Sequence, residues 1–227
     1  MYKDLVLINK ENNKDNSVKE VKDYLFAKNL MSVPITFSEF YEACKNYAIF
    51  FSKDEKDQWF ATALLGYKQN ENVYVNKKGE GDKLHYVPAF VRKYPFVIIQ
   101  ENKQQALAIE KDYLEENKDR KLFDDKQENS EFLNSVLSFL GKFETEYKST
   151  QDFIQQLDEW GILEEKTATI VKDEKEKYNI NKLFVVNEEK LNHLSKKKKE
   201  DMYSKNVIPL ITAHLISLTN VQKLGLK

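Results

Sequence analysis

The chain has 227 residues, with 36 basic and 37 acidic side chains, a formal net charge of -1, and 41% hydrophobic and 12% aromatic residues. A net charge this close to zero lacks the long-range field of a dedicated nucleic-acid binder, so we expect no nucleic-acid partner. The aromatic residues supply enough apolar surface for a folded core despite the many charges. The only arginines are Arg92 and Arg120. Most positive charges are therefore lysines, which are typical of a solvated surface.

No segment of the sequence is suited to cross a membrane. The first ten residues hold only a short apolar patch at 5–8, shorter than the apolar core of a signal peptide. The longest apolar stretch, 207–218, is interrupted by polar residues and is shorter than the roughly 20 residues that a spanning helix needs. We therefore expect no membrane span and a cytoplasmic location. Export by a signal-peptide-independent route, or association with the cell surface, is the alternative.

A first helix is predicted after Thr36, because Thr36 and Glu39 have the spacing of a capping box. Its apolar face consists of residues at positions i, i+3, i+4 and i+7: Phe37, Phe40, Tyr41 and Cys44. Cys44 is the only cysteine. We interpret it as a core residue, and the chain can form no internal disulfide.

Short strands follow this helix. They are predicted from apolar runs bounded by polar turns at 48–52, 59–67, 72–76, 95–100 and 106–110. The turn 101–104 separates the last two. Short connections of this kind join antiparallel neighbours, which favours an antiparallel meander over a parallel, doubly wound sheet.

The second half is richer in helix. Apolar residues recur at helical spacing over 132–147, which predicts a helix of about four turns. Ser149 or Thr150 suits the N-cap of a second helix, and Gly161 suits its C-terminal end. Together they predict an αα-hairpin.

Other segments of the second half are assigned from composition. The polar stretch 111–129 predicts a loop or inter-lobe connection, and Asn187 marks a helix start. The lysine run 196–199 is interpreted as a solvated helix face. A second strand pair is predicted with strands at 167–171 and 180–186 and a charged turn at 172–178. The last helix carries an apolar stripe of Val207, Ile211, Leu215 and Leu218.

These elements predict an α+β fold, in which mainly antiparallel sheets pack against the αα-hairpin and a C-terminal helix. The length suits a single domain over 1–227. Two lobes are the alternative: a sheet-rich lobe over about 1–112 and a helix-rich lobe with a small strand pair over about 129–227.

The segment 86–95 is the strongest candidate for a binding site. Pro88 and Pro95 bound a short helical turn between two strands. Such a turn can present four side chains to a common pocket: His85, Tyr86, Arg92 and Tyr94. Arg92 would supply a forked donor for a ligand carboxylate. In the alternative interpretation, the segment shapes the fold and Arg92 pairs with an internal carboxylate.

The three histidines are His85, His193 and His214. They show neither the spacing of a zinc helix nor that of a two-histidine iron site, so we expect no metal and no cofactor. His214 lies near the apolar stripe of the last helix, which favours a histidine bonded inside the core. It is retained as a candidate ligand-binding residue. No set of catalytic residues is predicted.

Three stretches resemble the SapC family of bacterial proteins: 27–34 with the helix and strand that follow it, 86–97, and 213–220. Segments at 2–10 and 132–160 also follow the family pattern, so the likeness spans nearly the whole chain. The resemblance implies an association with the locus that makes a bacterial surface layer, or with hydroxylase-like or halogenase-like neighbours. It implies no established reaction.

From this resemblance we expect an accessory protein of a surface-layer or export locus that is not an enzyme. It would bind a peptide or protein partner, such as a surface-layer, export or modifying-enzyme protein. The alternative is an enzyme or substrate-presenting partner that acts on an amino acid or peptide together with hydroxylase-like or halogenase-like proteins. A small pocket around Arg92 with a perturbed titratable residue would favour the alternative, and a broad exposed aromatic patch would favour the binding role.

Overall fold

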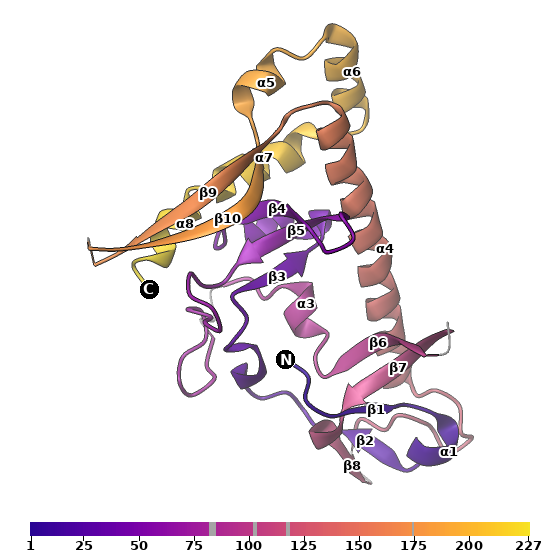
Figure 1. Cartoon of the computed structure of the whole chain (residues 1–227). Coiled ribbons are helices and arrows are strands. Elements are labelled where there is room, and N and C mark those ends of the chain that lie inside the picture. The colour runs from indigo at the N-terminus through magenta and orange to yellow at the C-terminus, as the bar shows by residue number, and fades with distance from the viewer. Residues whose placement is uncertain (82–84, 102–103, 117–118, 174) are drawn as a thin grey trace.

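The computed structural model describes residues 1–81, 85–101, 104–116, 119–173 and 175–227 (Figure 1). Parts of three predicted connections, at 102–103, 117–118 and 174, lie outside these residues. Helices combine with antiparallel strands, which confirms the α+β prediction.

The main sheet has five antiparallel strands. Their order across the sheet is β3 (Ser32–Ile35), β5 (Trp59–Leu64), β4 (Ile49–Lys53), β10 (Glu176–Val186) and β9 (Leu163–Lys172). The strand pair predicted in the second half therefore does not stand apart, because β10 pairs with β4 through Phe184 and Phe51. In Figure 1 the β9–β10 hairpin extends to one side of the molecule.

Two small antiparallel sheets lie at the end of the molecule opposite α5 and α6 (Figure 1). One is ordered β1 (Leu5–Leu7), β7 (Gln104–Glu110) and β6 (Phe96–Glu101), and the other pairs β2 (Asn16–Val18) with β8 (Leu114–Glu116). The predicted loop at 111–129 thus contains a strand, and its Leu122 and Phe123 are buried in a core.

The described helices range from four to 29 residues. They are α1 (Lys10–Asn13), α2 (Phe40–Ala43), α3 (Ala89–Arg92), α4 (Glu131–Glu159), α5 (Glu188–Asn192), α6 (Lys196–Ser204), α7 (Ile208–Ser217) and α8 (Asn220–Leu224). Three single turns of 3-10 helix are η1 (Leu25–Ala27), η2 (Phe37–Glu39) and η3 (Lys111–Tyr113).

The predicted αα-hairpin is wrong, because α4 is one continuous helix. Ser130 caps its start by accepting from the Leu133 amide at 3.1 Å. Neither Ser149 nor Thr150 caps the start of a new helix in this stretch: their hydroxyls donate to carbonyl oxygens four residues earlier, at 3.1 and 2.7 Å. Ser and Thr side chains can bond inside a helix as well as at its start, so their presence did not mark an end.

The C-terminal end of α4 was predicted correctly at Gly161, which has a φ of +76°. We expect Gly161→Ala to lower the free energy of unfolding by about 1 kcal/mol, because a side chain at positive φ is strained. No atom lies within 4 Å of the added Cβ, so the change in stability measures backbone strain and not a steric clash. Gly141→Ala, inside the same helix and also without a contact, should raise the free energy of unfolding by up to about 1 kcal/mol. Urea unfolding measures both, and shifts in the same direction would contradict this account.

Two other expectations are corrected. Tyr41 was placed on the inner face of the first helix, but its side chain is 48% exposed. The helix begins with the 3-10 turn η2, whose tighter winding shifts the later residues around the axis. The segment 72–76 forms no strand of the described sheets. Its Asn72 side chain instead accepts from the Tyr74 amide at 2.9 Å and donates to the Ala27 carbonyl at 3.1 Å.

The described residues form two hydrophobic cores, and α4 contributes to both. Ile154 and Leu157 of α4 pack in the main core with residues of the five-stranded sheet. Leu133 and Leu140, nearer its start, pack in a second core with residues of the small sheets. In Figure 1, α4 runs along one side of the molecule from α6 to β6 and β7.

Polar side chains of the C-terminal helices anchor them to the main sheet. Ser217 Oγ accepts from the Ile49 amide of β4 at 3.0 Å. Asn220 Nδ2 donates to the carbonyl oxygens of Cys44 and Tyr47, at 2.7 and 3.1 Å. These bonds join segments about 170 residues apart, so this stretch closes the main core.

Candidate functional site

A buried carboxylate, Glu39, organises the segment that the sequence marked as a site. Its Oε2 accepts from the amide and hydroxyl of Thr36, at 2.8 and 3.1 Å. Its Oε1 accepts from the Tyr86 hydroxyl at 2.9 Å and from the Ala89 amide at 2.7 Å. The capping-box carboxylate of η2 therefore also holds the start of α3.

The Tyr86 hydroxyl connects this carboxylate to Arg92. It accepts from Arg92 Nη2 at 3.1 Å, while Arg92 Nε donates to the Val87 carbonyl at 3.0 Å. The guanidinium also lies over the Phe139 ring of α4, 5.3 Å from its centroid. Arg92 is exposed. It pairs with no carboxylate among the described residues and reaches Glu39 only through Tyr86.

These groups form one wall of a cleft between α3 and α4. The cleft has a volume of about 360 Å³, and we call it the Arg92 cleft. It is lined by Ser38, Glu39, Tyr86, Ala89, Arg92, Phe139, Lys142, Phe143 and Glu146.

Glu146 of α4 also lines the cleft, next to the hydrogen bonds of Glu39. Its Oε2 accepts from the Ser38 hydroxyl at 2.5 Å and lies 3.2 Å from the Thr36 hydroxyl oxygen, whose proton is donated to Glu39. Its Oε1 lies 3.7 Å from Lys142 Nζ. The cleft thus presents a guanidinium, a phenol, an ammonium and two carboxylates beside an aromatic ring, a mixed set suited to binding polar groups of a peptide.

His85 lies on the other side of this segment. It lines a separate cavity of about 240 Å³ together with Tyr74, Val87 and Val91. Its ring packs edge-on against Tyr74, with centroids 5.2 Å apart. Successive side chains of an extended segment point to opposite sides, which separates His85 from Tyr86.

Tyr94 is buried and does not line the Arg92 cleft. Its ring stacks on Phe26, with centroids 3.8 Å apart, and contacts Tyr2 and Tyr113. Burial and the nearby Tyr113 raise the pKa of its phenol well above the ordinary value. Tyr94 lines a different hollow, at the N-terminal part of α4.

His214 is fully enclosed in the main core, away from the Arg92 cleft. Its Nε2 accepts from the Val186 amide at 3.1 Å, and its ring stacks on Phe51 with centroids 4.5 Å apart. Burial lowers the pKa of His214 to about 3, so the ring is neutral. Of the predicted residues, the structure places Tyr86 and Arg92 together in the Arg92 cleft. Tyr94 shares only the other hollow with Arg92, and His85 and His214 lie apart from both.

Cys44, interpreted from sequence as a core residue, is half-buried and packs against the main core. Burial raises the pKa of its thiol, which keeps it protonated at neutral pH.

Sequence reasoning missed the residues that complete the cleft. Glu39 was recognised only as a helix cap, and Phe139, Lys142 and Glu146 only as parts of a helix. The signal available in the sequence was the position of Glu39, an acid that stands directly before the apolar Phe40. This position places the carboxylate next to the core. A buried carboxylate requires donors beyond its own turn, and these come from 86–89.

Neither a metal site nor a membrane-spanning helix is found among the described residues. No group of three or more His, Cys, Asp and Glu side chains there is placed to hold a metal ion. None of the helices in those parts of the chain combines the length and the apolar character needed to cross a bilayer.

Comparisons with known proteins give one match. The SapC family model matches residues 8–224. Neither the curated proteins nor the solved structures contain a match.

Proposed function

The chain belongs to the SapC family, and on that basis we propose that it is an accessory protein of a bacterial surface-layer or export locus. In this proposal the Arg92 cleft binds a segment of a peptide or protein partner. The partner is a surface-layer, export or modifying-enzyme protein.

The geometry of Arg92 carries the proposal. Two of its nitrogens, Nε and Nη2, are held by Val87 and Tyr86, which fixes the plane of the guanidinium. Nη1 makes no hydrogen bond to any described residue. A guanidinium fixed in this way and left without a carboxylate is a prepared donor for an acceptor from another molecule.

The pKa of Tyr86 argues against a role as a catalytic base. Burial, together with Glu39, raises the pKa of Tyr86 to about 12. A small pocket that contains a residue with a shifted pKa is the observation that would favour the enzymatic alternative. The direction of the shift, however, keeps the phenol protonated at neutral pH, where it donates to Glu39 and cannot act as a base.

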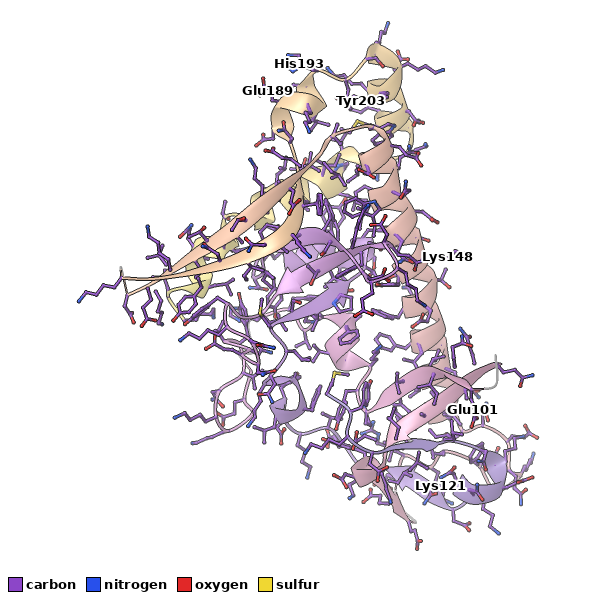
Figure 2. The ribbon with its side chains drawn as sticks, in the orientation of Figure 1. Glu101, Lys121, Lys148, Glu189, His193 and Tyr203 are labelled. Atoms are coloured by element: carbon purple, nitrogen blue, oxygen red, sulfur yellow. The ribbon has the colours of Figure 1, made fainter. Side chains whose placement is uncertain are left out.

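Site-specific photo-crosslinking in the native host tests this proposal. Lys142, at the cleft, is replaced by p-benzoylphenylalanine, and Lys148 on the same helix serves as the matched position outside the cleft (Figure 2). We expect a discrete adduct from position 142 that falls at least about fivefold in Arg92→Gln, since a fixed, charge-assisted donor is lost. Position 148 should give no such adduct.

Mass spectrometry of the adduct identifies the partner segment. Equal adducts from positions 142 and 148, or no adduct from 142 in cells that express the chain, would contradict partner binding at the cleft. An adduct from 142 that Arg92→Gln leaves unchanged would remove Arg92 from the binding site.

A further inference from the structure

A second hollow adjoins the Arg92 cleft along the N-terminal part of α4. It has a volume of about 180 Å³. Both arginines of the chain line it, although 28 positions separate them in the sequence. Phe96, Phe132 and Phe139 are among the other residues of its wall. We call it the two-arginine hollow.

Each arginine lies over a phenylalanine of α4. The Arg92 guanidinium is 5.3 Å from the Phe139 centroid, and the Arg120 guanidinium is 4.6 Å from the Phe132 centroid. Seven residues separate the two rings, which corresponds to about 10 Å along a helix axis. A guanidinium held against a ring loses freedom but keeps its N–H groups available for an acceptor.

The two-arginine hollow has no internal counter-charge. None of its lining residues is Asp or Glu, and neither arginine forms an ion pair with another described residue. Lys93 also lines it, but its ammonium lies over the Phe90 and Phe143 rings, at 4.3 and 5.2 Å. The two guanidiniums therefore dominate the charge of the hollow, and they favour an anionic ligand.

The dimensions favour an extended chain over a small anion. Arg92 and Phe139 line both the hollow and the Arg92 cleft, so the two are adjacent. Between Phe132 and Glu146 the helix advances by about 21 Å. An extended peptide covers this length with about six residues.

We propose that the two-arginine hollow binds the carboxylates of an acidic peptide segment, which continues along α4 into the Arg92 cleft. This inference rests on the proposed function and specifies the chemistry of the partner. Arg120, unlike Arg92, lines only the two-arginine hollow. Substitution of Arg120 therefore tests binding of the acidic segment without changing a residue of the Arg92 cleft.

The test is fluorescence anisotropy of the full chain with a labelled hexaglutamate peptide at low ionic strength, and with hexaglutamine as the uncharged match. We expect hexaglutamate to bind at least about tenfold more tightly than hexaglutamine, because each charge-assisted pair adds to affinity. Arg120→Gln and Arg92→Gln should each weaken hexaglutamate binding about tenfold. Lys148→Gln, which removes one positive charge elsewhere on α4, should change it less than about twofold.

If Arg120→Gln folds poorly, a second variant at the same position tests the proposal. Arg120→Lys retains the charge but not the planar fork, and we expect an intermediate loss of about threefold. Equal losses in Arg120→Gln and Lys148→Gln, or equal binding of hexaglutamate and hexaglutamine, would overturn the acidic-segment proposal. Competition by free glutarate at the same concentration as the peptide would also overturn the proposal, because the hollow would then be assigned to a small dicarboxylate.

Failure of this inference is distinguishable from failure of the proposed function. A cross-link from position 142 that persists in Arg120→Gln, combined with no preference for hexaglutamate, would retain partner binding and reject an acidic partner. Loss of the cross-link in Arg120→Gln, together with selective hexaglutamate binding to the unmodified chain, supports both.

Discussion

His214→Ala is expected to lower the free energy of unfolding by about 3 to 5 kcal/mol, because it removes a fully buried ring and leaves a cavity. Phe51 loses its stacked neighbour, and the Val186 amide loses its acceptor inside the core. Urea unfolding monitored by circular dichroism gives the value. Ile216→Ala, in the same helix but 55% exposed, is the matched control and should change stability by less than about 0.5 kcal/mol.

The same variant is expected to lose part of the pH dependence of stability. The pKa of His214 is lowered to about 3 in the folded chain, below its ordinary value of 6.5. Between these values the unfolded chain binds one more proton, so stability falls as pH falls below 6.5. At pH 5 this amounts to about 2 kcal/mol relative to neutral pH. If His214→Ala loses less than 1 kcal/mol, or keeps the full acid dependence, the buried neutral ring is not the cause.

Glu39→Ala is expected to lower the free energy of unfolding by about 3 kcal/mol or more. The carboxylate is buried and accepts four hydrogen bonds, so its removal leaves the Thr36 and Ala89 amides without an acceptor. The variant should also lose the cross-link from position 142, because the start of α3 and the Tyr86 hydroxyl are no longer held.

The matched control is Glu42→Ala. Glu42 lies on α2, close to Glu39 in sequence, but it is exposed and forms a surface ion pair with Lys45. Such pairs contribute little, so we expect a change below about 0.5 kcal/mol. A similar loss in both variants would show that the hydrogen bonds of Glu39 do not hold η2 to α3.

Local patterns predicted much of the fold. Apolar runs located β4, β5, β6, β7, β9 and β10, and Asn187 marked the start of α5, where its side chain accepts from the Lys190 amide at 2.9 Å. The continuity of α4 could not be predicted in this way. Thr150 accepts from the amide of Phe37 at 2.9 Å, a contact across 113 positions that helix patterns do not contain.

The candidate site was likewise predicted only where its residues lie close together in the sequence. Tyr86 and Arg92 lie six positions apart, on either side of Pro88, and the structure places the Tyr86 hydroxyl 3.1 Å from Arg92 Nη2. Glu39 enters through a bond across 47 positions, and Phe139 through packing from α4. Those partners depend on how α3 and α4 dock, which the sequence around either helix does not specify.

The polar anchors at 214–220 have a consequence for synthesis. The amide of Ile49 and the carbonyl oxygens of Cys44 and Tyr47 find their partners only in residues made about 170 positions later. We therefore expect a nascent chain to leave the apolar residues of β4 without their C-terminal cover until residues 214–220 have left the ribosome. A fragment that ends before this stretch should therefore aggregate more readily than the full chain.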